Sequence, residues 1–199
     1  METVLNRESP SIDLARRLRD LPRSAMVRGV FFSMLRDEVE RRALLSVREL
    51  AEILRNRDAW RLYPASELMT AYATTATLLH RDPNEGLRIL FASMPASYVK
   101  TWYGGIFRKF LLGEPERALR YVEKAREQLA SYGTWRLETM GPRHVVFQMT
   151  DEFFWIDTAQ RGGCEGLLEI CGVEGEVRAT LDGRYRGALD ITWRPKLTD

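Results

Sequence analysis

The spacing of apolar residues changes at Gly133, and this change constrains the fold more than any other feature of the sequence. Before Gly133, apolar residues recur every three or four positions, for example over 68–79, which is the period of an amphipathic helix. After Gly133, apolar and polar residues alternate over 135–140 and again over 144–149, which is the period of a strand. The sequence therefore predicts a helical part followed by a part built on a sheet.

The last third of the chain predicts an antiparallel sheet whose strands are interrupted once by a helix. A Gly-Pro-Arg turn joins the strands at 135–140 and 144–149 into a hairpin. A helix is expected at 154–171, followed by strands at 176–181 and 185–193 that an Asp-Gly turn connects. The resulting order, β-β-α-β-β, is typical of a small antiparallel sheet with helices packed on one face.

The first two thirds predict six to seven helices. Apolar residues at helical spacing indicate helices at 14–21 and 27–39, and Ser46-Val47-Arg48-Glu49 has the pattern of a capping box for the next one. Asp82-Pro83 opens a further helix with a capping carboxylate and a proline at its first position. The last long helix follows Glu114-Pro115.

We predict an α+β fold in which an N-terminal helical bundle of six to seven helices packs on a C-terminal four-stranded antiparallel β-β-α-β-β unit. Residues 1–24 are expected to form an N-terminal helical extension, and 25–199 a single α+β domain. Within that domain the helical part covers 25–133 and the β-β-α-β-β part covers 134–199. A chain of this size buries about 70% of its unfolded surface, so it needs no disulfide or metal to fold.

The near balance of basic and acidic residues indicates which kinds of binding partner to expect. The chain has 30 basic and 28 acidic residues and a pI of 8.6, which gives no electrostatic case for a nucleic-acid partner. The basic clusters Arg16-Arg17-Leu18-Arg19 and Arg41-Arg42 are interpreted as solvated helix faces. The alternative is a patch for a nucleotide or an anionic partner.

The two cysteines and the absence of long apolar runs indicate the compartment. Cys164 and Cys171 are seven residues apart, so on a helix they lie two turns apart and cannot form a disulfide. We read them as reduced, buried residues of a protein in a reducing compartment. No apolar run reaches the roughly 20 residues of a membrane span, and the start of the chain lacks the apolar segment of a signal peptide. We therefore predict a cytoplasmic protein.

The sequence contains no recognised catalytic, metal-binding or cofactor-binding motif. The Cys-x6-Cys spacing matches no zinc site, and neither a phosphate-binding loop nor a dinucleotide fingerprint occurs. No Gly-x-Ser-x-Gly elbow accompanies the two histidines, His80 and His144. We predict a protein that is not an enzyme and that carries no metal or cofactor. The first place to look for unrecognised catalysis is His144, near Asp151 and Glu152.

Two groups of residues are candidates for a ligand pocket or an interface. In each, large apolar side chains precede a pair of glycines, which either let a helix pack closely on a neighbour or leave room for a ligand beside it. The run 153–156 holds four consecutive large apolar residues, so it crosses the core or lines a pocket or interface. The candidates are Trp102, Tyr103, Gly104, Gly105, Phe153, Phe154, Trp155, Gly162 and Gly163.

Several short motifs occur in an order that resembles one protein family. They are Val27-Arg28-Gly29 with the two phenylalanines that follow, Leu62-Tyr63-Pro64, Gly86-Leu87 after Pro83, Pro115-Glu116-Arg117, and Gly187-x-x-x-Ile191-x-Trp193. Together they are similar to a family of paralogues of about this length, a domain of unknown function expanded in myxobacteria. The resemblance extends over almost the whole chain and implies no assigned activity.

The C-terminal part of that family looks like the fold shared by the 4-vinyl-reductase small-molecule domain, the vesicle-tethering TRAPP subunits and the haem nitric-oxide-binding domain. Fold analogy of this kind does not carry function by itself. The sequence departs from the haem branch, because the Tyr-x-Ser-x-Arg motif that anchors haem propionates there does not occur.

The function we favour from sequence is that of a non-catalytic signalling or adaptor protein. It would bind protein partners, a second copy of itself being one such partner, and could also hold a small apolar ligand. The first alternative is a sensor domain whose main role is to bind a small hydrophobic or acyl molecule. The second is an enzyme of unrecognised type.

Overall fold

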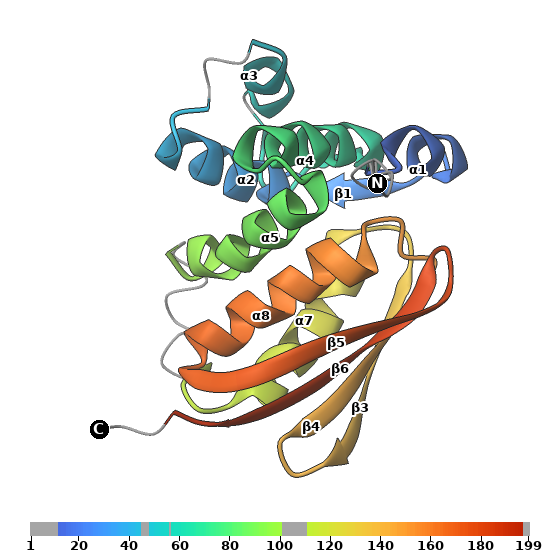
Figure 1. Ribbon diagram of the computed structural model, residues 1–199. Helices are drawn as coiled ribbons and strands as arrows, with labels where there is room; N and C mark the ends of the chain where they lie inside the picture. Colours follow the sequence, from blue (N-terminus) through green and yellow to red (C-terminus); the bar gives the residue numbers. More distant parts are fainter. Residues whose placement is uncertain (1–11, 45–47, 56, 101–110, 197–199) are drawn as a thin grey trace, which may run out of the picture.

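The computed structural model describes residues 12–44, 48–55, 57–100 and 111–196, which form two layers (Figure 1). The upper layer consists of helices, and the lower layer is a sheet with two helices on one face. The helices are α1 (Leu14–Asp20), α2 (Val30–Arg41), α3 (Arg48–Leu54), α4 (Ala65–Leu79) and α5 (Pro83–Lys100) in the upper layer, and α7 (Pro115–Leu129) and α8 (Arg161–Ile170) in the lower one. No helix within these ranges is long and apolar enough to cross a membrane.

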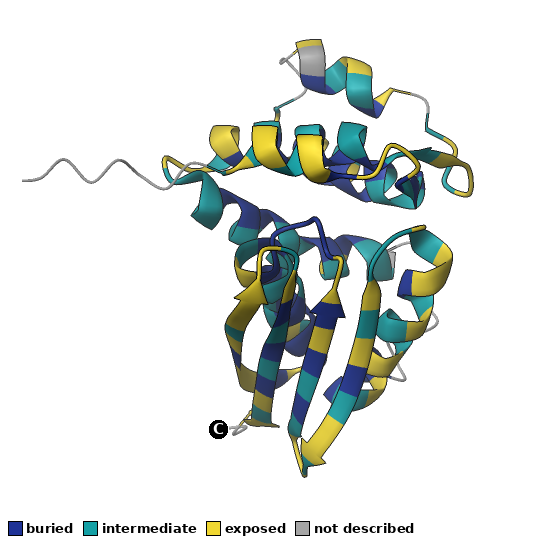
Figure 2. Cartoon of the chain, turned by 90° about the vertical axis from the view of Figure 1, so that its right-hand side faces the viewer, coloured by how far each residue is buried: buried dark blue, intermediate teal, exposed yellow. Residues whose placement is uncertain are grey.

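The sheet is antiparallel, with the strand order β3-β4-β6-β5. Its strands are β3 (Thr134–Gly141), β4 (His144–Thr150), β5 (Val173–Gly183) and β6 (Arg186–Pro195). Buried and more exposed residues alternate along β4 and most of β6 (Figure 2), as period-2 side-chain direction requires. Val145, Phe147 and Met149 of β4 are buried in one core with residues of α7 and α8. The predicted α+β class with a four-stranded antiparallel β-β-α-β-β unit is confirmed.

The helix predicted at 27–39 begins later than its apolar pattern indicated. Residues Met26–Arg28 form a short strand, β1, that pairs with a second short strand, β2 (Leu62–Pro64). Val27 is only 2% exposed and belongs to the core of the upper layer, but its backbone pairs with Tyr63 and bridges to Ala130 instead of forming a helical turn. The prediction was wrong here because tertiary contacts outweigh local periodicity over three residues.

The helix predicted at 154–171 also begins later. A π-helical turn, η1 (Ile156–Gln160), precedes α8, and residues 153–155 are not helical. The side chain of Glu152 accepts a hydrogen bond from the backbone N–H of Phe154 over 2.9 Å, which holds this segment in a non-helical conformation. The predicted end is confirmed, since Gly172 follows α8 with a φ of 70°.

The closest contact between the two layers is made by glycines of α8 against the backbone of α5. A Cβ atom at Gly162 would lie 2.3 Å from the carbonyl oxygen of Arg88, and one at Gly166 would lie 2.0 Å from that of Ala92. Any larger residue at either position would overlap the backbone of the facing helix. Arg88 strengthens the contact, because its Nη1 donates to Oε2 of Glu165 on α8 over 2.5 Å.

Two neighbouring glycines of α8 should therefore respond in opposite ways to the same substitution. We expect Gly162→Ala to lower the free energy of unfolding by about 1–3 kcal/mol, because the methyl group forces the two helices apart. The matched control is Gly163→Ala, since a Cβ atom at Gly163 would meet nothing within 4 Å. The control should be neutral, or more stable by up to about 1 kcal/mol through helix propensity. Urea unfolding of both variants measures the difference, and equal effects would contradict the close-packing role of Gly162.

Candidate ligand cavity

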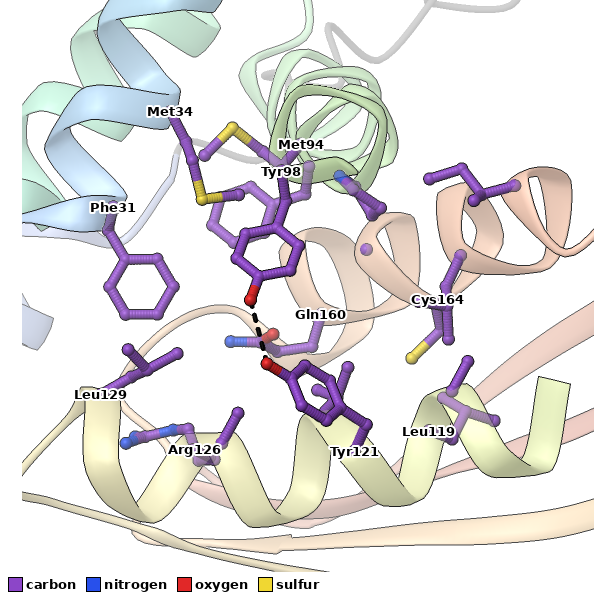
Figure 3. A pocket seen from close by; sticks show the side chains of 18 of the residues that line it. Phe31, Met34, Met94, Tyr98, Leu119, Tyr121, Arg126, Leu129, Gln160 and Cys164 are labelled. Atoms are coloured by element: carbon purple, nitrogen blue, oxygen red, sulfur yellow. Dashed lines mark hydrogen bonds between the residues drawn. The ribbon is translucent and has the colours of Figure 1, made fainter. Parts of the chain in front are cut away.

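A cavity of about 210 Å³ lies between α5, α7 and α8, with side chains of α2 at its edge (Figure 3). Its lining is almost entirely apolar and includes two methionines, which adapt readily to the shape of a ligand. The volume is below the roughly 300–1,000 Å³ of sites for drug-sized ligands, so it suits a smaller molecule. Its lining includes Phe31, Met34, Phe91, Met94, Tyr98, Leu119, Tyr121, Val122, Leu129, Cys164 and Leu167.

The space exists because small residues stand where the helices face one another. Ala118 and Ala125 of α7 and Gly163 of α8 all line the cavity, and a Cβ atom added at Gly163 would still be in open space. Pro95, inside α5, lines it as well. Proline has no N–H, so the carbonyl of Phe91 loses its usual helical partner beside the cavity.

The neutral polar groups of the lining include two tyrosine hydroxyls, a cysteine thiol and the amide of Gln160. The hydroxyl groups of Tyr98 on α5 and Tyr121 on α7 lie 3.0 Å apart and form a hydrogen bond between the two layers (Figure 3). Burial, and then the bond to Tyr121, raise the pKa of Tyr98. Burial also raises the pKa of Cys164 to about 12, with a smaller contribution from the charge of Glu165. Cys164 is therefore a protonated thiol at neutral pH, which makes it a poor nucleophile.

A second cavity of about 70 Å³ adjoins the first and shares several wall residues with it, among them Arg126, Trp135 and Gln160. It contains a buried ion pair, because Arg126 is 7% exposed and Glu152 is 1% exposed, and Nη2 of Arg126 lies 3.4 Å from Oε2 of Glu152. The same Oε2 accepts a bond from Nε1 of Trp135 over 2.7 Å. The two cavities together therefore offer a larger apolar space and a smaller space that contains a buried ion pair.

The residues proposed from sequence have different positions relative to these cavities. Gly163 lines the larger one and Phe154 the smaller one. Gly162 lies in the contact with α5, and Phe153 packs against Tyr132 and Tyr185 in the helical core. Trp155 is buried with its ring facing Phe154 and Arg17. The other four candidates, Trp102, Tyr103, Gly104 and Gly105, lie outside the described residues.

Two sequence interpretations are wrong. His144 begins β4 while Asp151 follows its end, so strand extension of about 3.3 Å per residue separates them. Nε2 of His144 instead lies 3.1 Å from a carboxylate oxygen of Asp190. In the Arg16-Arg17-Leu18-Arg19 cluster, Arg16 and Arg19 are exposed, but the interpretation as a solvated face is wrong for Arg17. Its Nη1 donates to the carbonyl of Phe153 over 2.8 Å, and its guanidinium lies 5.2 Å from the ring centre of Trp155. Burial lowers the pKa of Arg17.

Sequence reasoning missed Arg126, although the sequence carries a signal for it. Leu119, Val122 and Leu129 form the inward stripe of the helix that contains it, and Arg126 falls on the same stripe. A charged residue within an apolar helical stripe indicates a buried charge that needs a partner. From sequence, its partner Glu152 was considered only as a neighbour of His144, and the structure pairs it with Arg126 instead.

The fold is similar to solved structures of H-NOX proteins. For the Fe(II) unliganded protein from K. algicida the TM-score is 0.65 at 13% identity, covering 86% of this chain and 99% of that chain. For the protein from S. oneidensis in the Fe(II)NO state it is 0.62 at 14% identity, covering 84% and 99%. For an oxygen-binding H-NOX domain related to soluble guanylate cyclases it is 0.58 at 14% identity, covering 86% and 95%. At these identities the likeness concerns the fold alone.

The family of the chain follows from a sequence comparison. No curated protein matches the chain. The model of one family, described as a protein of unknown function (DUF2378), matches residues 22–194, which is most of the chain and agrees with the resemblance to a domain of unknown function. The chain therefore belongs to the DUF2378 family.

Proposed function

We propose that this protein is a sensor domain that binds a small apolar molecule in the cavity between α5, α7 and α8. The observation that carries the proposal is the cavity itself, which is apolar, lies where the two layers meet, and has a few polar groups at defined places. The fold likeness adds support, because one similar structure is described as an oxygen-binding domain related to soluble guanylate cyclases.

The proposal reverses the order of preference that the sequence indicated. The adaptor role came first there, with ligand binding second. A cavity with an organised lining favours the sensor. The exposed large apolar side chains of the described residues lie on several elements: Trp60 and Leu62 at β2, Leu78 on α4, Leu112 before α7, Met140 on β3 and Leu181 on β5. A sensor still passes its signal to another molecule, so protein partners and a homodimer stay predictions.

The similar structures raise the question of haem, which one of them names. Proteins hold haem iron with histidine, cysteine thiolate, tyrosine, or methionine together with histidine. Neither histidine lines the cavities: His80 is exposed at the end of α4, and His144 pairs with Asp190 on the sheet. Cys164 is a protonated thiol, and the hydroxyls of Tyr98 and Tyr121 bond each other.

An anchor for haem propionates does not form either. The nearest variant of the Tyr-x-Ser-x-Arg motif runs from Tyr132 to Arg136 and has threonine in place of serine. Trp135 lines both cavities, so the next residue along β3, Arg136, points to the opposite face, where its side chain is 75% exposed. The described residues do not fit haem, and we propose a ligand of another kind.

Added haemin should therefore not form a defined complex with the purified protein. We expect only weak, unsaturable absorbance changes when haemin is titrated into the protein, because the described part of the cavity linings supplies no axial ligand. An H-NOX protein titrated in parallel is the positive control. A sharp Soret band that saturates at one haemin per chain would overturn the exclusion of haem.

Filling the larger cavity should abolish ligand binding without unfolding the protein. We expect Gly163→Leu to weaken binding of a small apolar naphthylamine fluorophore at least about tenfold, because the new side chain occupies the cavity. The matched control is Gly141→Leu, since Gly141 also has open space at its Cβ position but lies at the β3–β4 turn. Fluorescence titration measures the affinities and circular dichroism checks folding.

The control variant should bind the fluorophore as the parent protein does. Either of two results would count against the sensor proposal. One is a parent protein that fails to bind any small apolar probe; the other is a folded Gly163→Leu protein that binds as well as Gly141→Leu.

A further inference from the structure

Among the described residues, Arg126 is a buried cation whose hydrogen bonds are incomplete. It lies on the inward face of α7 and lines both cavities (Figure 3), yet its Nη1 is buried and bonds to no group among the described residues. Its Nη2 reaches Glu152 only over 3.4 Å, whereas charge-assisted bonds of this kind are about 2.7–2.9 Å long. A buried guanidinium N–H without an acceptor costs free energy.

Two aromatic neighbours of Arg126 stabilise its charge without accepting a hydrogen bond from its N–H groups. Its guanidinium carbon lies 4.6 Å from the ring centre of Tyr132 and 5.3 Å from that of Trp135, distances at which ring faces attract cations. Glu152 is occupied by other donors, because Trp135 Nε1 donates to Oε2 and the N–H of Phe154 donates to Oε1. The arginine is thus held in place while a donor stays available at the junction of the cavities.

The groups around the junction limit the negative charge that an added anion would meet. Among the described residues of the cavity linings the charged groups are Arg126 and its partner Glu152, whose charges balance. Burial and the charge of Glu152 raise the pKa of Tyr132 well above its usual value, so that hydroxyl is neutral and adds no negative charge. The side-chain amide of Gln160 lines both cavities and offers a second polar contact.

We propose that the ligand is an aliphatic carboxylic acid, with its chain in the larger cavity and its carboxylate on Arg126 in the smaller one. This inference rests on the proposed sensor function and adds the chemical class of the ligand to it. The geometry matches such a molecule, because a space of about 210 Å³ with an apolar lining adjoins one of about 70 Å³ that contains the guanidinium. A carboxylate accepts two parallel bonds from a guanidinium, which supplies Nη1 with its missing acceptor.

The test compares octanoate with 1-octanol, which has the same chain length and no charge. For the full-length protein we expect octanoate to bind about 10- to 100-fold more tightly, the usual range for a hydrogen bond to a charged group. Displacement of the fluorophore and isothermal titration calorimetry measure both affinities at pH 7.5, where octanoate is ionised.

Two variants test whether Arg126 causes the preference for octanoate over 1-octanol. Arg126→Met combined with Glu152→Gln removes both buried charges together, so no unpaired ion is left to unfold the protein, and it should bind the two probes equally. Glu152→Gln alone keeps Arg126 and removes the competing carboxylate, so its preference for octanoate should increase. Urea unfolding confirms that both variants are folded.

The outcomes separate this inference from the sensor proposal. Equal binding of the two probes by the parent protein, or a preference for octanoate that survives in the double variant, overturns the carboxylate assignment and leaves an apolar sensor. Failure of the parent protein to bind either probe overturns both.

Discussion

Backbone contact between α5 and α8 is the constraint on which the arrangement of the layers depends. At Gly162 and Gly166 the two helices approach as closely as main-chain atoms allow, and the bond from Arg88 to Glu165 fixes their register. The opposite side of α8 packs on the sheet through Leu168, which shares a core with Phe147 and Ile191. The spacing between the helical layer and the sheet therefore follows from the absence of two side chains.

The cavity is a consequence of the same geometry. Near the start of α8, Gly162 brings the helix onto α5, while its neighbour Gly163 lines the cavity, as do the small residues Ala118 and Ala125 of α7. The two adjacent glycines thus have different roles, because Gly162 allows close contact with α5 and Gly163 leaves space for the cavity. The likeness to H-NOX structures concerns the positions of the helices and strands, whereas the interior is set by these residues and by Arg126. One fold can hold very different ligands for this reason.

The sequence predicted the elements of the fold better than their boundaries. The change from helical spacing to alternation at Gly133 and the glycine stop at Gly172 are strong local signals. They were sufficient to place the start of the sheet part and the end of α8. The strand that contains Val27 was not predictable, because three residues carry too little periodicity and the partners Leu62–Pro64 are distant in sequence. The late start of the helix is associated with a hydrogen bond from the backbone N–H of Phe154 to the side chain of Glu152, and the periodicity of the sequence gives no sign of such a bond. The only sign in the sequence of the buried ion pair was Arg126, an arginine on an apolar helical stripe. The predicted candidates around Trp102 lie outside the described part of the chain.

The backbone contacts on α5 also determine how a disturbance would travel through the molecule. A Cβ atom at Gly86 on α5 would lie 2.2 Å from the carbonyl oxygen of Ala76 on α4, so α5 touches α4 as directly as it touches α8. Side chains can change rotamer and absorb a displacement, but main-chain atoms in contact cannot. A molecule that displaces Met94 would therefore press, through the main-chain contacts of α5, on α4 as well as on α8.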